Sequence, residues 1–500
     1  MIATIPSACL LGVDGHPVLV EVHVSNGLPG FTIVGLPDTA CREARDRVRA
    51  ALLSSGLPWC RKRVTVNLAP SGLRKSGAGL DLAIAVGLLA AEGVLRAEEI
   101  EGIAFIGELG LDGSIRPVAG VVPLADALCA RKVVVPESCV LQARLVQHSD
   151  VSGAVNLQQL VAALRGESPW PIGAPVEARR PATGPDLSEV RGQPLARWAL
   201  EVAAAGGHNI LMTGSPGSGK TMLARRLAGI LPDLDNRVAL ECTKVHSAAG
   251  LLDEYQGLLL RPPMRAPHHT ASMVSLIGGG TAAMRPGEVS LSHGGTLFLD
   301  EMSEFAPAVL DALRQPLEEG VVRVARARAS VTFPARFMLV GATNPCPCGD
   351  GLVPGACRCP GVVRARHQAR LSGPLKDRFD LRIAVMRPKI DQLFETQSAE
   401  SSEIVRSRVQ DARLRVAARG VRCNAELSGA LLERFTPLTS TAQALLESEL
   451  RNGTLTARGL SRVRRVALTI ADLQGRSVLT DEHVAAALQL RPPPAALEAA

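Results

Sequence analysis

The chain contains the stretch Gly214-Ser215-Pro216-Gly217-Ser218-Gly219-Lys220-Thr221. This stretch fits the pattern G-x-x-x-x-G-K-[ST], in which glycines let successive backbone N–H groups turn inward around a polyphosphate. The ammonium group of Lys220 can reach the β- and γ-phosphates, and the hydroxyl of Thr221 can hold Mg²⁺. The stretch therefore predicts a site for ATP and Mg²⁺.

The residues on either side of this loop predict the strand and the helix that such a loop joins. Residues 209–212 are an apolar run that predicts a buried parallel strand, and residues 222–231 predict a helix. The phosphates would then lie at a helix N-terminus, where backbone N–H groups and the helix dipole favour an anion. A chance glycine-rich turn is the alternative, and the flanking strand and helix argue against it.

Two carboxylates and an amide complete the expected hydrolytic site. Asp300 and Glu301 follow the apolar residues 296–299. Asp300 would bind Mg²⁺ through water, and Glu301 would orient and deprotonate the attacking water. Asn344 follows a second apolar strand and could place its amide between these carboxylates and the γ-phosphate; an ordinary Asn-Pro turn with Pro345 is the alternative.

Two arginines are candidates for contacts with a nucleotide. Arg378 could reach the nucleotide of a neighbouring subunit as an arginine finger acting in trans. Arg458 begins a predicted helix and could contact the γ-phosphate from above. For both residues the alternative is a solvated arginine or a surface salt bridge.

Composition limits the class of protein. The 500 residues are 46% hydrophobic, yet no apolar run reaches the ~18 residues that cross a bilayer. The N-terminus lacks the basic region of a secretory signal, so we expect a cytoplasmic protein with no membrane partner. A net charge of +7 permits a nucleic-acid partner, and with only 3% aromatic residues such binding would rely on phosphate contacts rather than base stacking.

The pattern of apolar residues divides the chain into a multidomain α/β protein. Residues 1–166 alternate strand and helix patterns that predict a separate α+β domain, in which Asp38 caps a helix. Closely spaced prolines predict a linker at 167–186. Residues 187–387 predict a parallel sheet that binds nucleotide, and residues 388–500 predict a helical lid.

Several longer motifs point to a family. With the phosphate loop, the chain resembles the ComM/YifB family of magnesium-chelatase-like AAA+ ATPases over nearly its whole length. The resemblance implies a hexameric ring with nucleotide between subunits, and a DNA helicase that drives branch migration in natural transformation and recombination. The motifs that carry it are Ala205-Gly206-Gly207-His208-Asn209, Arg265-Ala266-Pro267-His268-His269-Thr270, Leu313-Arg314-Gln315-Pro316-Leu317-Glu318, Asn344-Pro345-Cys346-Pro347-Cys348-Gly349 and Ser372-Gly373-Pro374-Leu375.

The first domain resembles the Lon-protease-type fold, a module like domain 2 of ribosomal protein S5. The likeness is clearest over residues 107–120. Lon-like proteases need a Ser–Lys dyad, but Val122 stands near the position of the lysine and residues 74–78 do not reproduce the serine motif. We therefore expect a non-proteolytic scaffold or a module that contacts DNA or a partner. Arg74 and Lys75 could contact a phosphate, but we expect them in a solvated loop.

Two segments would contact DNA in such a ring. Residues 266–293 form a predicted insert with a glycine-rich stretch. Residues 321–333 alternate like a β-hairpin whose tip carries Arg323, Arg326 and Arg328. In a hexamer these arginines would surround the pore and follow the phosphate backbone. A solvated basic hairpin is the alternative.

Four of the eleven cysteines lie close together in the sequence: Cys346, Cys348, Cys357 and Cys359. Four thiols on one short loop could bind Zn²⁺ tetrahedrally, although C-x-C is tighter than the usual C-x-x-C spacing. The alternative is a loop of structural cysteines, and disulfides are disfavoured in the cytosol.

Three other functions remain open at this point. The chain could be the motor subunit of a magnesium chelatase that inserts Mg²⁺ into a porphyrin, or an AAA+ remodeller of proteins. An ATP-dependent protease is the third, and the absence of the dyad lysine argues against it.

Overall fold

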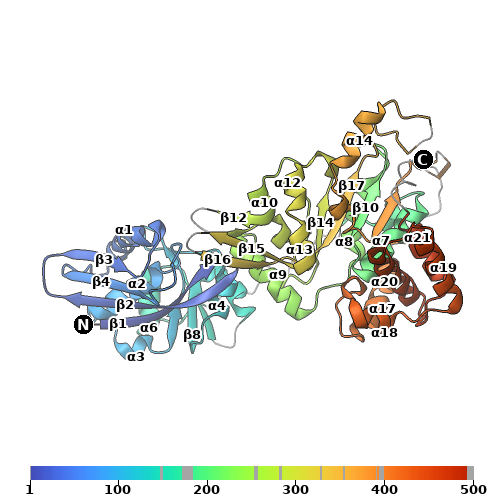
Figure 1. Cartoon of the computed structure of the whole chain (residues 1–500). Helices are drawn as coiled ribbons and strands as arrows, with labels where there is room; N and C mark the ends of the chain where they lie inside the picture. The colour runs from blue at the N-terminus through green and yellow to red at the C-terminus, as the bar shows by residue number, and fades with distance from the viewer. Residues whose placement is uncertain are drawn as a thin grey trace.

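The computed structural model describes residues 2–146, 150–171, 184–252, 257–280, 284–326, 329–352, 355–389, 391–392 and 399–492. It is a mixed α/β structure with a central parallel sheet and many helices. The molecule is elongated, with the N-terminal strands at one end, the central sheet in the middle and the C-terminal helices at the other end (Figure 1). Among the described residues, no helix combines the length and the apolar character that crossing a bilayer requires.

The N-terminal part is built on a four-stranded sheet of order β1-β2-β4-β3. Its strands are β1 (Ile2–Leu11), β2 (Asp14–Ser25), β3 (Gly30–Val34) and β4 (Arg63–Ala69). In β2 the alternate valines 18, 20, 22 and 24 are buried, as their period of two predicts. Helices α1 (Thr39–Ser54) and α2 (Asp81–Ala91) pack beside the sheet. The predicted cap of α1 is confirmed, because Asp38 accepts a hydrogen bond from the Cys41 N–H at 2.8 Å.

A second small sheet completes this part. Its three parallel strands, β5 (Ile103–Phe105), β8 (Lys132–Pro136) and β9 (Asp150–Ala154), lie beside a short hairpin of β6 (Glu108–Leu109) and β7 (Ile115–Arg116). The remaining elements are α3 (Ala97–Ile100), α4 (Val121–Asp126), η1 (Glu137–Cys139), α5 (Val140–Arg144) and α6 (Leu157–Leu164).

The expected position of Lys75 is wrong. Lys75 is fully buried rather than solvated, and its ammonium group donates a hydrogen bond to the carbonyl of Pro70. Its backbone is held between Leu36 and Asp38, whose peptide groups exchange hydrogen bonds with it at 3.2 and 3.0 Å. Burial lowers the pKa of Lys75, since the charged form loses its hydration. The residue therefore has no route to a phosphate on the surface.

The central sheet has five parallel strands in the order β11-β14-β17-β10-β18. They are β10 (Ile210–Thr213), β11 (Met264–Arg265), β14 (Thr296–Leu299), β17 (Met338–Thr343) and β18 (Leu381–Ala384). The predicted strands over 209–212 and 296–299 are confirmed, and β10, between β17 and β18, is buried. Helices α7 (Pro194–Gly206), α8 (Lys220–Ile230) and α9 (Asn236–Ala249) complete this unit, preceded by η2 (Leu187–Glu189).

Between α9 and β17, several short helices and strands are inserted along the chain between the strands of the parallel sheet. The predicted insert over 266–293 contains α10 (Met273–Ile277), β12 (Gly278–Gly279), β13 (Arg285–Pro286) and α11 (Glu288–Leu291). After β14 come η3 (Met302–Glu304), α12 (Pro307–Asp311) and α13 (Arg314–Glu319). The predicted hairpin is confirmed as β15 (Val321–Arg326) and β16 (Ala329–Pro334).

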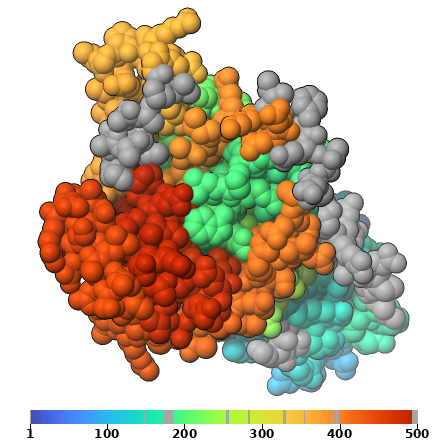
Figure 2. Space-filling model, turned by 90° about the vertical axis from the view of Figure 1, so that its right-hand side faces the viewer, coloured from blue at the N-terminus to red at the C-terminus, as the bar shows by residue number. Residues whose placement is uncertain are grey.

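The C-terminal part is helical, as predicted. Helices α14 (Gly361–Ala369) and α15 (Gly373–Lys376) precede β18. The C-terminal part follows β18 and contains α17 (Ser402–Ala417), η4 (Asn424–Glu426), α18 (Gly429–Phe435), α19 (Ser440–Arg451), α20 (Ala457–Leu473) and α21 (Asp481–Gln489). Helices α17 and α20 pack against α7 and share one apolar core with the sheet. Figure 2 shows these red and orange helices directly beside the green segment of the nucleotide-binding unit.

The N-terminal part contacts the central unit through α4 and α9. The Gly120 N–H donates to the carbonyl of Ser247 at 2.8 Å, and Lys244 forms an ion pair with Asp126 at 2.5 Å. The domain boundaries at 166, 186 and 387 stay predictions. Most of the predicted linker, residues 172–183, lies outside the described residues.

Candidate nucleotide-binding site

The phosphate loop joins β10 to α8 and leaves no room for a larger side chain at its start. A Cβ atom on Gly214 would lie 2.3 Å from the carbonyl oxygen of Val385. Gly217 and Gly219 have φ values of +76° and +92°, in the left-handed region that favours glycine. Helix α8 begins directly at Lys220, so its first N–H groups point into the turn of the loop.

Lys220 lies inside this loop. Its Nζ atom donates hydrogen bonds to the carbonyls of Gly214 at 2.7 Å and Ser215 at 3.0 Å, and to Oδ1 of Asn344 at 3.1 Å. Burial lowers the pKa of Lys220, and the neighbouring charge of Asp300 opposes this shift. A phosphate beside Nζ would stabilise the charged ammonium group in the same way.

Thr221 and Asp300 face each other across the sheet edge. The Thr221 hydroxyl donates to Oδ2 of Asp300 at 2.6 Å. Strands β10, β17 and β14 are parallel, so the residues that follow them meet at one edge of the sheet. Oδ1 of Asp300 accepts a hydrogen bond from the Glu301 N–H at 3.0 Å. A hydroxyl and a carboxylate oxygen at this separation are hard ligands of the kind that Mg²⁺ prefers.

Glu301 has a different setting from Asp300. Its backbone φ is +47°, and its side chain is 58% exposed. Its carboxylate is therefore accessible to water. This arrangement separates one carboxylate that is held against Thr221 from one that can move a proton.

His269 lies beside Glu301, a neighbour that the sequence did not predict. Its Nδ1 atom is 3.5 Å from Oε2 of Glu301, and its ring makes an edge contact with Phe305 at 6.5 Å between centroids. Strands β11 and β14 are parallel neighbours, which brings the residues after each strand to the same edge. His269 belongs to the motif over residues 265–270, but its position beside Glu301 depends on β11, and a strand of two residues is too short to detect by periodicity.

Gln193 and Arg387, which the sequence also did not predict as part of the site, contact the phosphate loop. The Gln193 Nε2 atom donates to the carbonyl of Ser218 at 2.6 Å, and an Nη atom of Arg387 donates to the carbonyl of Pro216 at 3.1 Å. Inside the loop, the buried Ser218 hydroxyl has no hydrogen-bond partner among the described residues. An unpaired buried hydroxyl is costly, and a bound phosphate oxygen would satisfy it.

Arg378 and Arg458 lie near each other. Burial lowers the pKa of Arg378, and the nearby charges of Arg462, Arg458 and Arg314 lower it further. Arg378 also forms an ion pair with Glu318. Within the described ranges, no hydrogen bond or ion pair joins Arg378 or Arg458 to residues 214–221. With Arg314 and Arg462 these two arginines form a positive cluster, in which Arg378 pairs with Glu318 and Arg462 pairs with Asp380 at 3.4 Å.

The base of the β15–β16 hairpin is apolar, and Arg323 lies on its exposed side. Val322, Val324, Val331 and Phe333 are buried. The hairpin rests on the turn between β1 and β2, where a Cβ atom on Gly12 would lie only 2.1 Å from Val331. Arg323 is 56% exposed and pairs with Glu319. Arg328 and the side chain of Arg326 lie outside the described residues.

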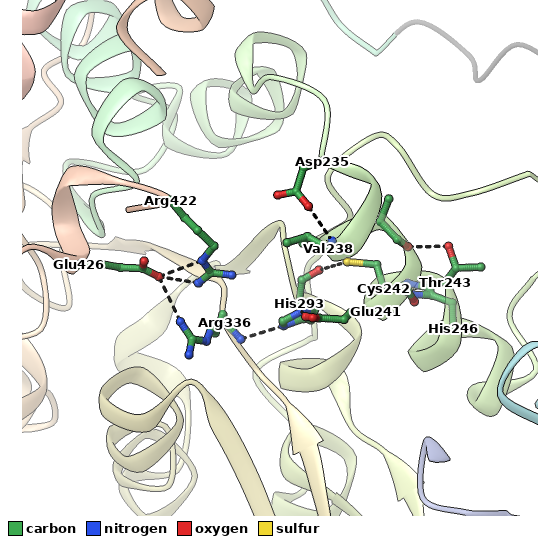
Figure 3. Close-up of polar contacts among 11 residues, drawn as sticks. Asp235, Val238, Glu241, Cys242, Thr243, His246, His293, Arg336, Arg422 and Glu426 are labelled. Carbon is green, nitrogen blue, oxygen red and sulfur yellow. Dashed lines mark hydrogen bonds and ion pairs between the residues drawn. The ribbon is translucent and has the colours of Figure 1, made fainter. Parts of the chain in front are cut away.

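A polar network connects the end of this hairpin to the C-terminal helices (Figure 3). Arg336, just after β16, lies 3.5 Å from a carboxylate oxygen of Glu426, which also binds Arg422 at 2.5 Å. The Arg336 N–H donates to Nδ1 of His293 at 3.1 Å. Because this nitrogen accepts, Nε2 of His293 carries the proton and donates to Glu241 at 3.0 Å. The network thus joins α9, the hairpin and η4.

The four clustered cysteines meet in space. Their sulfur atoms all lie within 4.8 Å of one another, in the loop that follows Asn344. Hydrogen bonds from the backbone of Asp350 and Arg358 lower the pKa of the Cys348 thiol to about 6, whereas burial raises the pKa of Cys346 to about 12.

Three family models match the chain. Residues 186–393 match the model described as magnesium chelatase, subunit ChlI; residues 20–138 match subunit ChlI of Mg-chelatase; and residues 399–491 match the C-terminal part of that subunit. The magnesium-chelatase-like AAA+ family is one of nucleotide-driven motors.

Several relatives are similar to the chain along almost its whole length. An uncharacterized protein of Mycobacterium tuberculosis is 44% identical, and the alignment covers 97% of each chain. The uncharacterized protein YifB of Escherichia coli is 42% identical, over 96% of this chain and 95% of its own. The competence protein ComM of Haemophilus influenzae is 41% identical, over 98% and 97%. This chain therefore belongs to the ComM/YifB family of magnesium-chelatase-like AAA+ proteins.

Proposed function

We propose that this protein is an ATPase that works as a ring, most simply a hexamer, and uses ATP hydrolysis to move DNA strands during recombination and natural transformation. One observation carries the ATPase part. Lys220, Thr221, Asp300 and Asn344 come from three separate segments of the chain and are hydrogen-bonded to one another in two pairs at one sheet edge.

The residues of this site divide the work of hydrolysis between them. The loop from Gly214 to Gly219 would hold the phosphates, and Lys220 would exchange its three present partners for phosphate oxygens. Thr221 and Asp300 would hold Mg²⁺, which neutralises charge that develops on the phosphates. Glu301 would accept the proton of the attacking water, and Asn344 would fix the position of that water or of the γ-phosphate.

The positive cluster around Arg378 supports a site shared between subunits. An arginine finger stabilises the negative charge of the transition state, and it must come from outside the loop that binds the phosphates. Among the described residues, Arg378 makes no hydrogen bond or ion pair with the phosphate loop of its own chain, as expected of a residue that serves a neighbour. Arg458 would contact the γ-phosphate from above. Membership of the AAA+ family supports oligomers of this kind.

The DNA part of the proposal rests on the hairpin and on one relative. The hairpin carries Arg323, Arg326 and Arg328, and its apolar base fixes it to the rest of the molecule. The similar protein of Haemophilus influenzae is named a competence protein, which supports a role in transformation. Arginines on hairpins that converge in a ring would contact phosphates without reading the base sequence.

The alternatives are a chelatase motor and a protein remodeller. The descriptions of the three family models favour the chelatase motor. The full-length likeness to a competence protein favours the DNA motor. Measuring the ATPase rate with a four-way DNA junction, single-stranded DNA, a porphyrin or an unfolded protein separates them. We expect stimulation by the junction, and stimulation by the porphyrin alone would transfer the proposal to the chelatase motor.

The double substitution Arg326→Ala with Arg328→Ala tests the hairpin. We expect weaker DNA binding and a smaller dependence of that binding on salt, because fewer phosphates are neutralised. The ATPase rate without DNA should equal that of the wild type, since the hairpin tip is not part of the phosphate site. Binding titrations at several salt concentrations measure the effect. An unchanged salt slope would remove the hairpin from the DNA path.

A further inference from the structure

We propose that Cys346, Cys348, Cys357 and Cys359 hold one zinc ion, and that this centre braces the phosphate loop. The four sulfurs lie within 4.8 Å of one another. Cys346 and Cys348 are 3.2 Å apart, Cys348 and Cys357 are 3.8 Å apart, and Cys357 and Cys346 are 3.6 Å apart. A tetrahedral ion with Zn–S bonds of about 2.3 Å separates its sulfurs by about 3.8 Å. The widest separation, at most 4.8 Å, exceeds this value by about 1 Å, so shifts of about 1 Å or less would complete the site.

The ligand set selects the kind of metal. Four thiolates in a tetrahedron favour Zn²⁺ over Mg²⁺ or Ca²⁺, which prefer oxygen ligands. Sulfurs this close together surround one ion and leave no room for a cluster of several metals. The site is also accessible, because Cys346 is buried whereas Cys348 is exposed and the other two are partly exposed.

The loop needs such a centre to hold its shape. Between the end of β17 and the start of α14, the described residues contain turns and bends but no helix or strand. A segment without helix or strand hydrogen bonds gains little from its own backbone, and a structural metal would fix its shape. Two C-x-C pairs, one at each end of the loop, would tie those ends together.

Contacts at the start of this loop connect the cysteines to the phosphate site. Asn344, two residues before Cys346, accepts the hydrogen bond from Lys220. A Cβ atom on Gly349 would lie 2.3 Å from Cδ of Pro216, so the turn after Cys348 packs directly on the phosphate loop. At the far end of the loop, Nε2 of His367 in α14 donates to the carbonyl of Asn344 at 3.1 Å.

The consequence is a coupling between metal and nucleotide. With zinc bound, Asn344 and the surface that supports Pro216 are held in place before ATP arrives. Without zinc, the cysteine-containing loop would have to become ordered when ATP binds. The free-energy cost of this ordering would lower the affinity for ATP. This second step rests on the proposed ATPase function, whereas the metal centre itself does not.

Metal analysis of the purified full-length chain tests the centre. We expect one zinc per chain, released when a mercurial reagent titrates the four thiols. Cys357→Ser with Cys359→Ser should lose the zinc. Cys129→Ser removes an exposed cysteine outside the cluster and should keep it. Much less than one zinc in the unaltered chain, iron in its place, or thiols already oxidised to disulfides would overturn the assignment.

Nucleotide binding after zinc removal tests whether the zinc centre supports the phosphate loop. Wild-type protein stripped by a chelator, with folding checked by circular dichroism, should bind a fluorescent ATP analogue about tenfold more weakly, ~1.4 kcal/mol. Added zinc should restore the affinity and added Mg²⁺ alone should not. Equal affinity for the ATP analogue with and without zinc would show that the zinc centre does not support the phosphate loop. Lys220→Ala should keep its zinc while losing nucleotide, which separates failure of the centre from failure of the ATPase.

Discussion

At the scale of single residues, the site rests on a few hydrogen bonds between distant parts of the chain. Lys220 bonds to Asn344, and Thr221 bonds to Asp300. Each of these side chains sits at the end of a parallel strand or at the start of the helix that follows one. The strands bring them within hydrogen-bonding distance, so a change to any one residue removes a specific part of the site.

Replacing Lys220 by Ala should abolish nucleotide binding or turnover. The substitution removes the buried ammonium group that would neutralise the β- and γ-phosphates, and nothing else in the loop carries a positive charge. Equilibrium binding of a fluorescent ATP analogue measures the effect. Binding at the wild-type affinity would show that the phosphates lie elsewhere.

Replacing Glu301 by Gln should separate binding from chemistry. The amide keeps the shape of the side chain but cannot accept the proton of the attacking water, so ATP still binds and the hydrolysis rate falls by 10²-fold or more, roughly the contribution of a general base. Single-turnover kinetics with separate measurement of binding checks this. A hydrolysis rate close to that of the wild type would exclude Glu301 as the base.

A site residue can be predicted from the sequence when a short motif around it defines its role. It cannot be predicted when its role depends on contacts with distant segments. The phosphate loop and the pair Asp300–Glu301 follow from motifs read along the chain. His269 and Gln193 do not, because their contacts with Glu301 and Ser218 exist only once distant segments have packed. The prediction for Lys75 is wrong for a similar reason. Its charge favours solvent, but the fold encloses it and gives its ammonium group a carbonyl partner.

At the scale of elements, the strands of the nucleotide-binding sheet and the C-terminal helices are predictable. Their apolar runs are long enough for their period to show. Elements such as β11 and β12 contain two residues each and carry no periodicity. The hairpin was predicted from its alternating valines, but its attachment to the C-terminal helices through Arg336 and Glu426 was not.

This attachment predicts a selective effect for Glu426→Gln. Weakening the pairs with Arg336 and Arg422 should cost little stability, about 1 kcal/mol or less, because these side chains are partly exposed. It should reduce the stimulation of ATPase by DNA, since the hairpin would no longer be tied to η4. Glu447→Gln is the matched control, because it removes an exposed pair with Arg451 on α19 that has no link to the hairpin. Equal effects of the two substitutions would contradict a role for this network.

At the scale of the whole molecule, packing between distant parts could not be predicted. Residues 1–166 contact α9 through Gly120 and Asp126, and the β1–β2 turn supports the hairpin at Val331. Neither contact has a sequence signature, because each depends on two surfaces that are complementary only after both have folded. The N-terminal part thus lies against the hairpin that we propose contacts DNA, so it can respond to movement of that hairpin (Figure 1).

The assembly of several chains gives the last prediction. If Arg378 serves a neighbour's nucleotide, Arg378→Ala and Glu301→Gln should each be inactive alone but should regain activity when mixed. A chain that lacks only Arg378 has a complete site of its own, and a neighbour carrying Glu301→Gln supplies the missing arginine. With random mixing of equal amounts, about one interface in four is complete, so the rate should approach about a quarter of the wild-type rate. Mixing Glu301→Gln with Lys220→Ala is the control, because both defects lie in the same chain's site and no arrangement repairs it. If Arg378 instead acts within its own chain, neither mixture recovers activity, and the nucleotide would not be shared between subunits.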